Sequence, residues 1–313
     1  MIALTIFPFF LLFSLLASFR VSEDVPYQSL IVSQSIGDFG NIQQGRLVNS
    51  SSNLFWEWRN FTDNLGASIA GITVSTNYEN IAIGMMSKMG ILSSNGRSFS
   101  VLATNLTRCH YAIVFPAKHM ILYTDADEHI YQVDLTTKKQ TVLLNHVGGS
   151  AGTRGLVYDS INNWLYFSGV QLMRSRLDGT ELQNITRYLN LNYENPGFQI
   201  ALDHHFDSKN PRVYLAFNGG LYMVNADGSK EKLIYSSSVE TNYTGPYGVA
   251  IGTDPGDGQR YIFWCRGRRE KEAYLERSIL DNDGQLRTIE LLYHSSARVG
   301  QWLYALALVP WRF

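Results

Sequence analysis

Short apolar segments recur along this chain, and turn-forming residues separate them. One type of segment occurs six times with a matching pattern, beginning at Ala70, His110, Arg154, Phe198, Tyr247 and Tyr304. Successive starts lie 40, 44, 44, 49 and 57 residues apart. A repeat of this length is typical of architectures in which each unit buries its apolar face only against its neighbours.

Each unit has further parts in a fixed order. A second β-rich segment follows four of the starts, at residues 122–125, 166–169, 214–217 and 263–266. A third segment ends in an Asp-Gly turn in three units, at residues 178–179, 227–228 and 283–284. A fourth segment closes the unit, as at residues 232–235 and 288–292. Since Asp-Gly supplies the positive φ of tight hairpins, the pattern predicts four antiparallel strands per unit, as in a propeller blade.

The number of units predicts how the ring closes. The sixth inner strand, residues 304–309, has no chain after it to complete a blade. Apolar or alternating segments at residues 27–33, 44–48 and 54–58 can supply the missing outer strands. We therefore expect an all-β fold over residues 27–313, a six-bladed β-propeller with four-stranded antiparallel blades. Pairing of the N- and C-terminal strands would close the ring and leave no open sheet edge within it.

Residues 154–186 carry a more specific resemblance. Arg-Gly-Leu-Val-Tyr-Asp, then Trp-Leu-Tyr-Phe-Ser-Gly and Leu-Asp-Gly-Thr, resemble a low-density-lipoprotein-receptor class B repeat, and Leu-Tyr-Thr-Asp at residues 122–125 matches the Tyr-Trp-Thr-Asp segment of that family. The resemblance implies a six-bladed propeller in an extracellular setting. Asp125 retains the family's acidic residue, whereas Gly169, Phe217 and Arg266 replace it, so we expect the inter-blade hydrogen bonding of that Asp to be lost in most blades.

The N-terminus and the sequons place the chain in the secretory route. An apolar run with small residues after it makes residues 1–18 a predicted signal peptide, and an uncleaved membrane anchor stays open as the alternative because no Lys or Arg precedes the run. The apolar C-terminal stretch is too short to span a membrane. Five N-glycosylation sequons begin at Asn49, Asn60, Asn105, Asn184 and Asn242. The sequence thus predicts a secreted glycoprotein with no membrane span after signal cleavage.

Charge and cysteine content exclude one class of partner and one means of stabilising the fold. The net charge of −1, with 17% charged residues, argues against nucleic acid, which requires a basic face. Two cysteines are too few for a disulfide framework. Cys109 and Cys265 fall in opposite blades of the expected ring, so we expect two thiols that do not join in a disulfide.

Two clusters of polar residues offer candidate chemistry. Residues 281–285, Asp-Asn-Asp-Gly-Gln, resemble the start of a calcium loop, but they occupy a hairpin slot and Leu292 stands where the loop needs Glu, so a turn is the better interpretation. Residues 203–207, Asp-His-His-Phe-Asp, contain a carboxylate and imidazoles, the residue types of a general base and its orienting partner. Their place between two strands favours an exposed polar loop instead. We predict no catalytic residues, no metal site and no cofactor.

A basic run in the longest unit is the candidate partner-binding site. Its cations are Arg266, Arg268, Arg269 and Lys271. Such runs are usually solvated loops, but on a protruding hairpin these cations are suited to contact a sulfated glycan or an acidic protein.

Two functions therefore stay open at this point. The first is a binding or structural module, such as an extracellular-matrix component, that contacts an extracellular protein or glycan. The alternative is a calcium-dependent hydrolase of the lactonase or arylesterase type, in which Asp159 and Asp203, at matching ends of two inner strands, would contribute to a channel metal.

Overall fold

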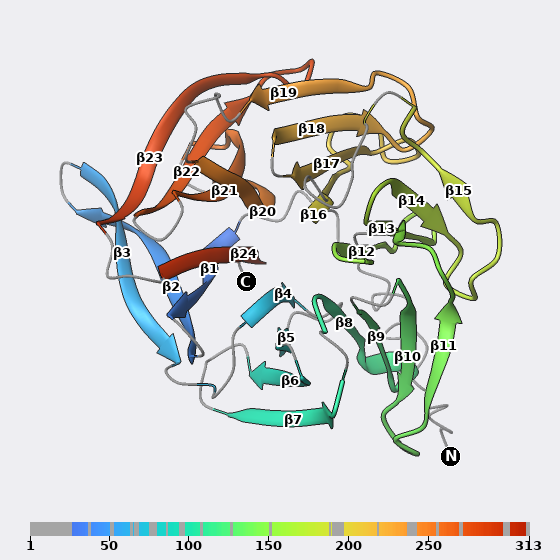
Figure 1. Cartoon of the computed structure of the whole chain (residues 1–313). Coiled ribbons are helices and arrows are strands. Elements are labelled where there is room, and N and C mark those ends of the chain that lie inside the picture. The colour runs from blue at the N-terminus through green and yellow to red at the C-terminus, as the bar shows by residue number, and fades with distance from the viewer. Residues whose placement is uncertain are drawn as a thin grey trace, which may run out of the picture.

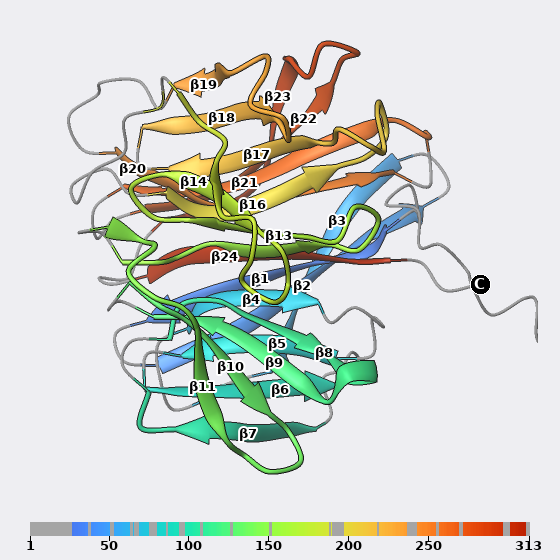
Figure 2. The same cartoon turned by 90° about the vertical axis from the view of Figure 1, so that its right-hand side faces the viewer.

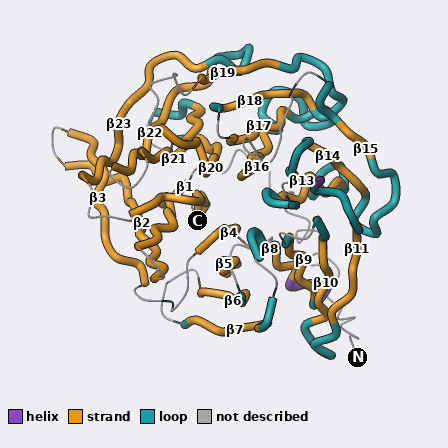
Figure 3. The backbone as a smooth tube through the Cα atoms, viewed as in Figure 1, coloured by secondary structure: helices purple, strands orange, loops and turns teal. Residues whose placement is uncertain are grey.

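A computed structural model describes most of the chain. The described residues are 27–36, 39–50, 53–62, 65, 69–74, 80–85, 87–93, 98–106, 109–125, 128–149, 152–187, 189, 197–217, 219–236, 243–254, 257–268, 272–296 and 301–310. The expected signal peptide, Asn242, Arg269 and Lys271 lie outside them. Strands and loops make up nearly all of this part of the chain (Figure 3), which includes the short 3₁₀ helix η1 at Pro116–Lys118. No helix in these ranges has the length and apolar character that a membrane span requires.

The described strands form six four-stranded antiparallel sheets around a common centre (Figure 1). The strands nearest the centre are β4 (Ile69–Val74), β8 (Ala112–Phe115), β12 (Leu156–Asp159), β16 (Gly197–Asp203), β20 (Tyr243–Thr253) and β24 (Gln301–Pro310). The second strands are β5 (Asn80–Met85), β9 (Met120–Thr124), β13 (Trp164–Ser168), β17 (Arg212–Phe217), β21 (Arg260–Arg268) and β1 (Tyr27–Ile36). Each sheet is named below by its innermost strand. This arrangement is a β-propeller with four-stranded antiparallel blades.

The outer half of each sheet has the same order. The third strands are β6 (Lys88–Ser93), β10 (Ile130–Asp134), β14 (Leu172–Ser175), β18 (Gly220–Asn225), β22 (Glu272–Leu280) and β2 (Phe39–Ser50). The outermost strands are β7 (Phe99–Thr104), β11 (Gln140–Leu144), β15 (Gln183–Asn184), β19 (Lys232–Ser236), β23 (Leu286–Ser296) and β3 (Asn53–Thr62). In the side view the outermost strands β19 and β7, of the β16 and β4 sheets, lie at opposite edges of the molecule (Figure 2).

The two ends of the chain meet in one sheet, with the strand order β24-β1-β2-β3. Strand β1 is antiparallel to β24, with Tyr27 opposite Pro310 and Ile36 opposite Gln301. Strand β24 also contacts β20 on one side and β4 on the other, and the remaining inner strands contact one another in chain order. The N-terminal strands therefore form the outer part of the sheet whose inner strand is C-terminal.

Burial follows from the position of a strand within its sheet. Strands β8 and β9 are buried along their whole length, because a neighbouring sheet covers each of their faces, whereas the outermost strand β11 is mostly exposed. The apolar core consists of clusters between adjacent sheets. One of them joins the β12 and β16 sheets through Tyr166, Leu172, Ile200, Leu202, Val213 and Leu215.

The Asp-Gly hairpin turns predicted from the sequence are confirmed. Gly179, Gly228 and Gly284 have φ values of 85°, 83° and 74°. This left-handed conformation is one that glycine adopts without a steric penalty. In the third turn the Asp281 carboxylate accepts hydrogen bonds from the amides of Asp283 and Gln285, at 2.9 and 2.8 Å. These bonds agree with the hairpin interpretation of residues 281–285.

Candidate functional site

The two axial ends of the propeller hold different chemistry. We call the end at which the inner strands begin, and the second strands finish, the entry end. The opposite end, where each inner strand turns into the second strand, is the turn end. Both ends bring together residues of adjacent sheets.

Hydroxyl groups link adjacent sheets at the entry end. Thr124, at the end of β9, accepts a hydrogen bond from the Tyr111 amide at 3.1 Å and donates to the Arg154 carbonyl of the next sheet at 2.8 Å. Ser168, at the matching position of β13, accepts from the Gly155 amide at 2.9 Å and donates to the Phe198 carbonyl at 2.7 Å. In each case the hydroxyl donor and the carbonyl acceptor are 30 residues apart in the chain, so the same bridge occurs twice.

Other residue types occupy this position in the remaining sheets. Gly84 stands there in β5, where a Cβ atom would collide with the His110 carbonyl of the next sheet. Ala216 stands there in β17, and the Gln199 side chain instead accepts a hydrogen bond from the Val249 amide at 3.2 Å. The β4 and β16 sheets thus accommodate the backbone of the next sheet without a hydroxyl bridge at this position.

This finding changes the expected role of Asp125. Its carboxylate accepts a hydrogen bond from the His129 amide of the same sheet at 2.9 Å, and its carbonyl accepts one from the Thr153 amide at 3.1 Å. The carboxylate therefore organises its own loop, while the Thr124 hydroxyl makes the bridge to the next sheet. The expectation had considered only the fourth residue of the segment and overlooked the third.

A row of cationic and aromatic side chains crosses the entry end. The Arg154 guanidinium lies 5.2 Å from the centre of the Phe198 ring. The Phe198 ring contacts the Tyr247 ring edge to face, with centroids 4.9 Å apart. Arg154 and Phe198 are half-buried and Tyr247 is nearly buried. These three side chains, here called the entry row, come from the starts of three successive inner strands.

The turn end places the cluster at residues 203–207 differently from what the sequence suggested. Asp203 and His204 are buried rather than exposed, and only His205 and Asp207 of the titratable residues reach solvent. The Asp203 carboxylate pairs with Arg260 of the next sheet, with Nε and Nη2 at 2.8 and 2.7 Å. The prediction of a uniformly exposed loop is wrong here, because its first two residues still pack between sheets.

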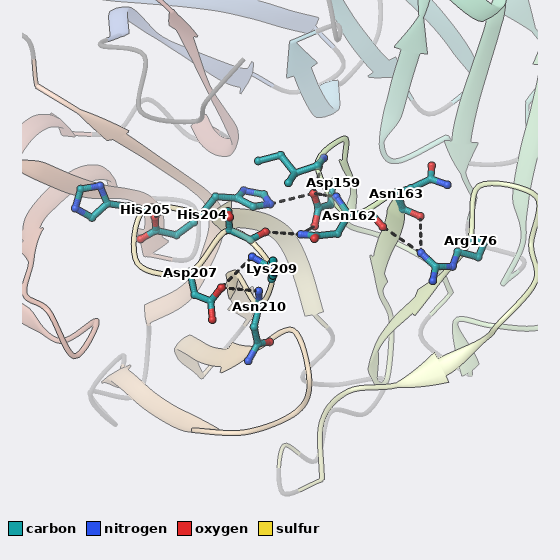
Figure 4. A network of polar contacts seen from close by, with 12 residues as sticks. Asp159, Asn162, Asn163, Arg176, His204, His205, Asp207, Lys209 and Asn210 are labelled. Atoms are coloured by element: carbon teal, nitrogen blue, oxygen red, sulfur yellow. Dashed lines mark hydrogen bonds and ion pairs between the residues drawn. The ribbon is translucent and has the colours of Figure 1, made fainter. Parts of the chain in front are cut away.

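The His204 imidazole pairs with Asp159 of the preceding sheet (Figure 4). Its Nε2 atom lies 2.9 Å from Asp159 Oδ1, and both side chains are shielded from solvent. Burial acts to raise the pKa of Asp159, but hydrogen bonds from His204 and Asn162 outweigh it and lower the pKa below its ordinary value. Asp159 therefore stays ionised at neutral pH.

The β20 sheet has a buried carboxylate at the same place. Asp254 directly follows β20, is 1% exposed and lies 3.2 Å from Nη1 of Arg277. Arg277 also binds Glu290 of β23 at 2.8 Å. The sequence analysis named only Asp159 and Asp203 at such ends, because this inner strand is longer and the aspartate falls later in its unit.

Arg266 of the basic run is held within its sheet. Two of its guanidinium nitrogens donate to the Glu276 carboxylate at 2.9 and 2.7 Å, and the group stacks over Tyr274 at 4.4 Å. Arg268 ends β21 opposite Glu272 in the register. The structure thus gives Arg266 an internal ion pair instead of the solvated position the sequence suggested.

The sequons and cysteines occupy contrasting positions. Asn105 and Asn184 are exposed, and Asn49 and Asn60 lie in β2 and β3. Glycosylation at all five positions stays a prediction.

Cys109 and Cys265 are buried and form no disulfide, which confirms the prediction from their spacing. Burial raises the pKa of the Cys265 thiol to about 12 and the pKa of Cys109 further, so we expect both thiols to resist alkylation in the folded state.

Comparisons with known proteins identify the fold class only. No protein-family model and no curated protein sequence matches the chain. A solved structure described as a nidogen/laminin complex is similar at a TM-score of 0.66 and 15% identity, covering 90% of this chain and 98% of that one. TolB of Acinetobacter baumannii is similar at a TM-score of 0.62 and 14% identity, covering 91% and 68%.

A third structure agrees with the first two. A putative TolB of Agrobacterium tumefaciens is similar at a TM-score of 0.55 and 13% identity, covering 90% of this chain and 99% of that one. At these identities the likeness shows the β-propeller fold. The class B repeat therefore stays a resemblance carried by short motifs. Within the described ranges, no group of three or more His, Cys, Asp or Glu side chains is arranged to hold a metal ion.

Proposed function

We propose that this protein is a secreted glycoprotein whose propeller binds an extracellular protein through the entry end. The entry row carries the proposal. Arginine and aromatic side chains are the residues most enriched where protein interfaces gain their binding energy. In Arg154, Phe198 and Tyr247 these residue types contact one another on the starts of three inner strands, which hold them in a fixed arrangement.

Other observations support the extracellular setting. The N-terminal apolar run and the five sequons are what a secreted glycoprotein requires, and Asn105 and Asn184 have the exposure that a glycan needs. The similar nidogen/laminin structure is described as a complex, which supports a protein partner.

The same proposal includes the finer features of the fold. We infer a six-bladed ring of divergent class-B-like repeats that the pairing of β24 with β1 closes. The six sheets and the contacts of β24 with both β20 and β4 support this inference.

A protein partner is preferred to a sulfated glycan because Arg266 of the basic run already neutralises Glu276. We infer a binding role rather than catalysis, and calcium analysis of the purified protein tests the hydrolase alternative.

Affinity capture with matched variants tests the binding site. The secreted protein, immobilised by a tag, is exposed to an extracellular extract of its source tissue, and retained proteins are quantified by mass spectrometry. Arg154→Ala with Phe198→Ala should reduce retention of the partner at least about tenfold, as expected for loss of interface anchors. His205→Ala with Lys209→Ala, at exposed turn-end positions, should retain it. Equal retention by both variants would refute the entry-end proposal, provided that their melting temperatures match.

A further inference from the structure

The outermost strand of the β20 sheet differs from most of the other edge strands. β23 has 11 residues, whereas β7, β11, β15 and β19 have 6, 5, 2 and 5. Natural edge strands are commonly kept short or carry charged residues, lysine above all, or proline, which prevents pairing with another chain. β23 contains no lysine or proline, its charged residues are Arg287 and Glu290, and its outer edge faces away from the ring centre (Figure 1).

Two large aliphatic side chains are exposed on β23. Ile289 is 46% exposed and Leu291 is 56% exposed. They lie opposite Ser278 and Glu276 of β22, so both point to the same face of the sheet. Of the other exposed aliphatic residues in the described part of the chain, Val101, Val142 and Leu233 lie singly on outermost strands, and Ile161 and Leu182 of the β12 sheet lie in different connections between strands. The pair on β23 is therefore an apolar strip rather than an isolated exposed side chain.

The charge between these two residues does not protect the edge. Glu290 points to the opposite face, where the Arg277 guanidinium binds its carboxylate at 2.8 Å. Arg277 is 11% exposed and also binds buried Asp254. Because the pair is formed within the sheet, Glu290 does not present an unneutralised charge to an approaching strand.

The end of β23 is anchored by stacking across three strands. Arg266, Tyr274 and His294 are directly opposite one another in the register. The guanidinium lies 4.4 Å from the Tyr274 ring centre, and the His294 ring stacks on Tyr274 with centroids 4.7 Å apart. This stack and the Arg266–Glu276 ion pair hold the long hairpin in place, so its edge is ordered before any partner binds.

We propose that β23 is a self-association surface, at which β23 of a second copy pairs antiparallel with it about Glu290. This register places Ile289 of each copy opposite Leu291 of the other, so the apolar strips cover each other on one face. On the other face the two Glu290 side chains meet, each neutralised by its own Arg277. Two-fold symmetry brings identical antiparallel edges together, which is the common geometry of closed homodimers.

The self-complementary register favours this occupant over a strand from another protein. A foreign strand would have to supply aliphatic residues at matching alternate positions, whereas a second copy supplies them by symmetry. The resulting dimer would leave both entry ends accessible, because the contact is at the outer rim. This inference goes beyond the binding role proposed above and does not depend on it.

Molar-mass measurement tests the proposal. The secreted protein is examined by size-exclusion chromatography with light scattering over a range of concentrations. Wild type should show twice the monomer mass, and Ile289→Lys and Leu291→Lys should show the monomer mass. Val142→Lys and Leu233→Lys, which are 50% and 47% exposed on other outermost strands, are the matched controls and should remain dimeric. A monomeric wild type, or a dimer that survives Leu291→Lys, would overturn the proposal.

Cross-linking tests the register itself. Residue 290 faces its own copy in the proposed pairing, and opposed Cβ atoms in antiparallel strands come within about 5.5 Å, close to disulfide reach. Glu290→Cys should form an intermolecular disulfide under mild oxidation, whereas Thr288→Cys, which does not face itself, should form much less. Equal cross-linking by both variants would exclude this register.

Discussion

The two ends of the propeller join the same sheets by different chemistry. At the entry end the links described above are neutral. The hydroxyl groups of Thr124 and Ser168 each donate a hydrogen bond to a backbone carbonyl of the next sheet. At the turn end carboxylates make buried links, Asp159 with the His204 imidazole and Asp203 with the Arg260 guanidinium. The Asn162 side chain adds a neutral link there by donating to the Ser208 carbonyl of the next sheet at 2.6 Å. Both kinds join the β12 sheet to the β16 sheet, one at each end of the same inner strands.

The difference shows how each link depends on its partners. A hydroxyl bridge needs one small polar side chain, because its acceptor is a backbone carbonyl that any residue provides. An ionic link needs two matched side chains from different sheets, and loss of one leaves a charge in a dry environment. The turn end should therefore be the more sensitive to single substitutions, and the entry end should tolerate variation of the kind seen at Gly84 and Ala216.

The largest effect should come from the buried ion pair at the turn end. Arg260→Met leaves the fully buried Asp203 carboxylate without its cation and should lower the free energy of unfolding by about 3–5 kcal/mol. Chemical denaturation measures the loss, and Arg187→Met, at an exposed position outside the two ionic pairs and outside β23, is the control. Asp203→Asn combined with Arg260→Met should recover part of the loss, because the stranded charge is gone. If both single variants are equally stable, the ionic link carries no stability.

A hydroxyl bridge at the entry end should matter less. Ser168→Ala removes the donor to the Phe198 carbonyl and the acceptor for the Gly155 amide, and should cost about 1–3 kcal/mol. Thr124→Ser keeps the hydroxyl and should lose less than Thr124→Ala. The same denaturation experiment applies, with Thr141→Ala on the exposed part of β11 as the control. A loss at Ser168 larger than that at Arg260 would reverse the contrast between the two ends.

The smallest expected effect is on the pH dependence of stability at the turn end. The lowered pKa of Asp159 means that its contribution to stability is complete above the ordinary pKa of about 4 and is lost as pH falls through the lower folded-state value. The stability difference between wild type and Asp159→Asn should therefore shrink as pH is lowered from 7 toward 3. Asp283→Asn, in an exposed hairpin turn, serves as the reference. A difference that stays constant over this range would show that ionisation of Asp159 is not linked to folding.

The sequence predicted the features of the fold that depend on local pattern. Four antiparallel strands per blade follow from alternating apolar segments separated by Asp-Gly turns, and those turns have the expected positive φ. The length of β23 was not anticipated, because the extension lies in residues beyond the apolar run. Local pattern therefore identifies a blade better than it delimits its outermost strand.

The site was predicted less well, because its contacts join distant residues. Asp159 and His204 are 45 residues apart and Asp203 and Arg260 are 57 apart, so the sequence indicated neither pair. Asp159 and Asp203 were interpreted as acidic ends of inner strands, and His204 as part of an exposed polar loop. Arg266 was assigned to a solvated basic run because Glu276 is brought beside it only by the hairpin register. The entry row likewise depends on the starts of three inner strands lying side by side.

Hydrogen exchange tests the central claim, that the entry end binds a protein partner. Amide exchange is measured for the protein alone and while it is bound to its captured partner. Exchange should slow at residues 109–112, 152–156, 197–199 and 247–249 of the entry end, and should not change at residues 160–164 and 204–210 of the turn end. Slowing at the turn end alone, with the entry end unchanged, would contradict the account.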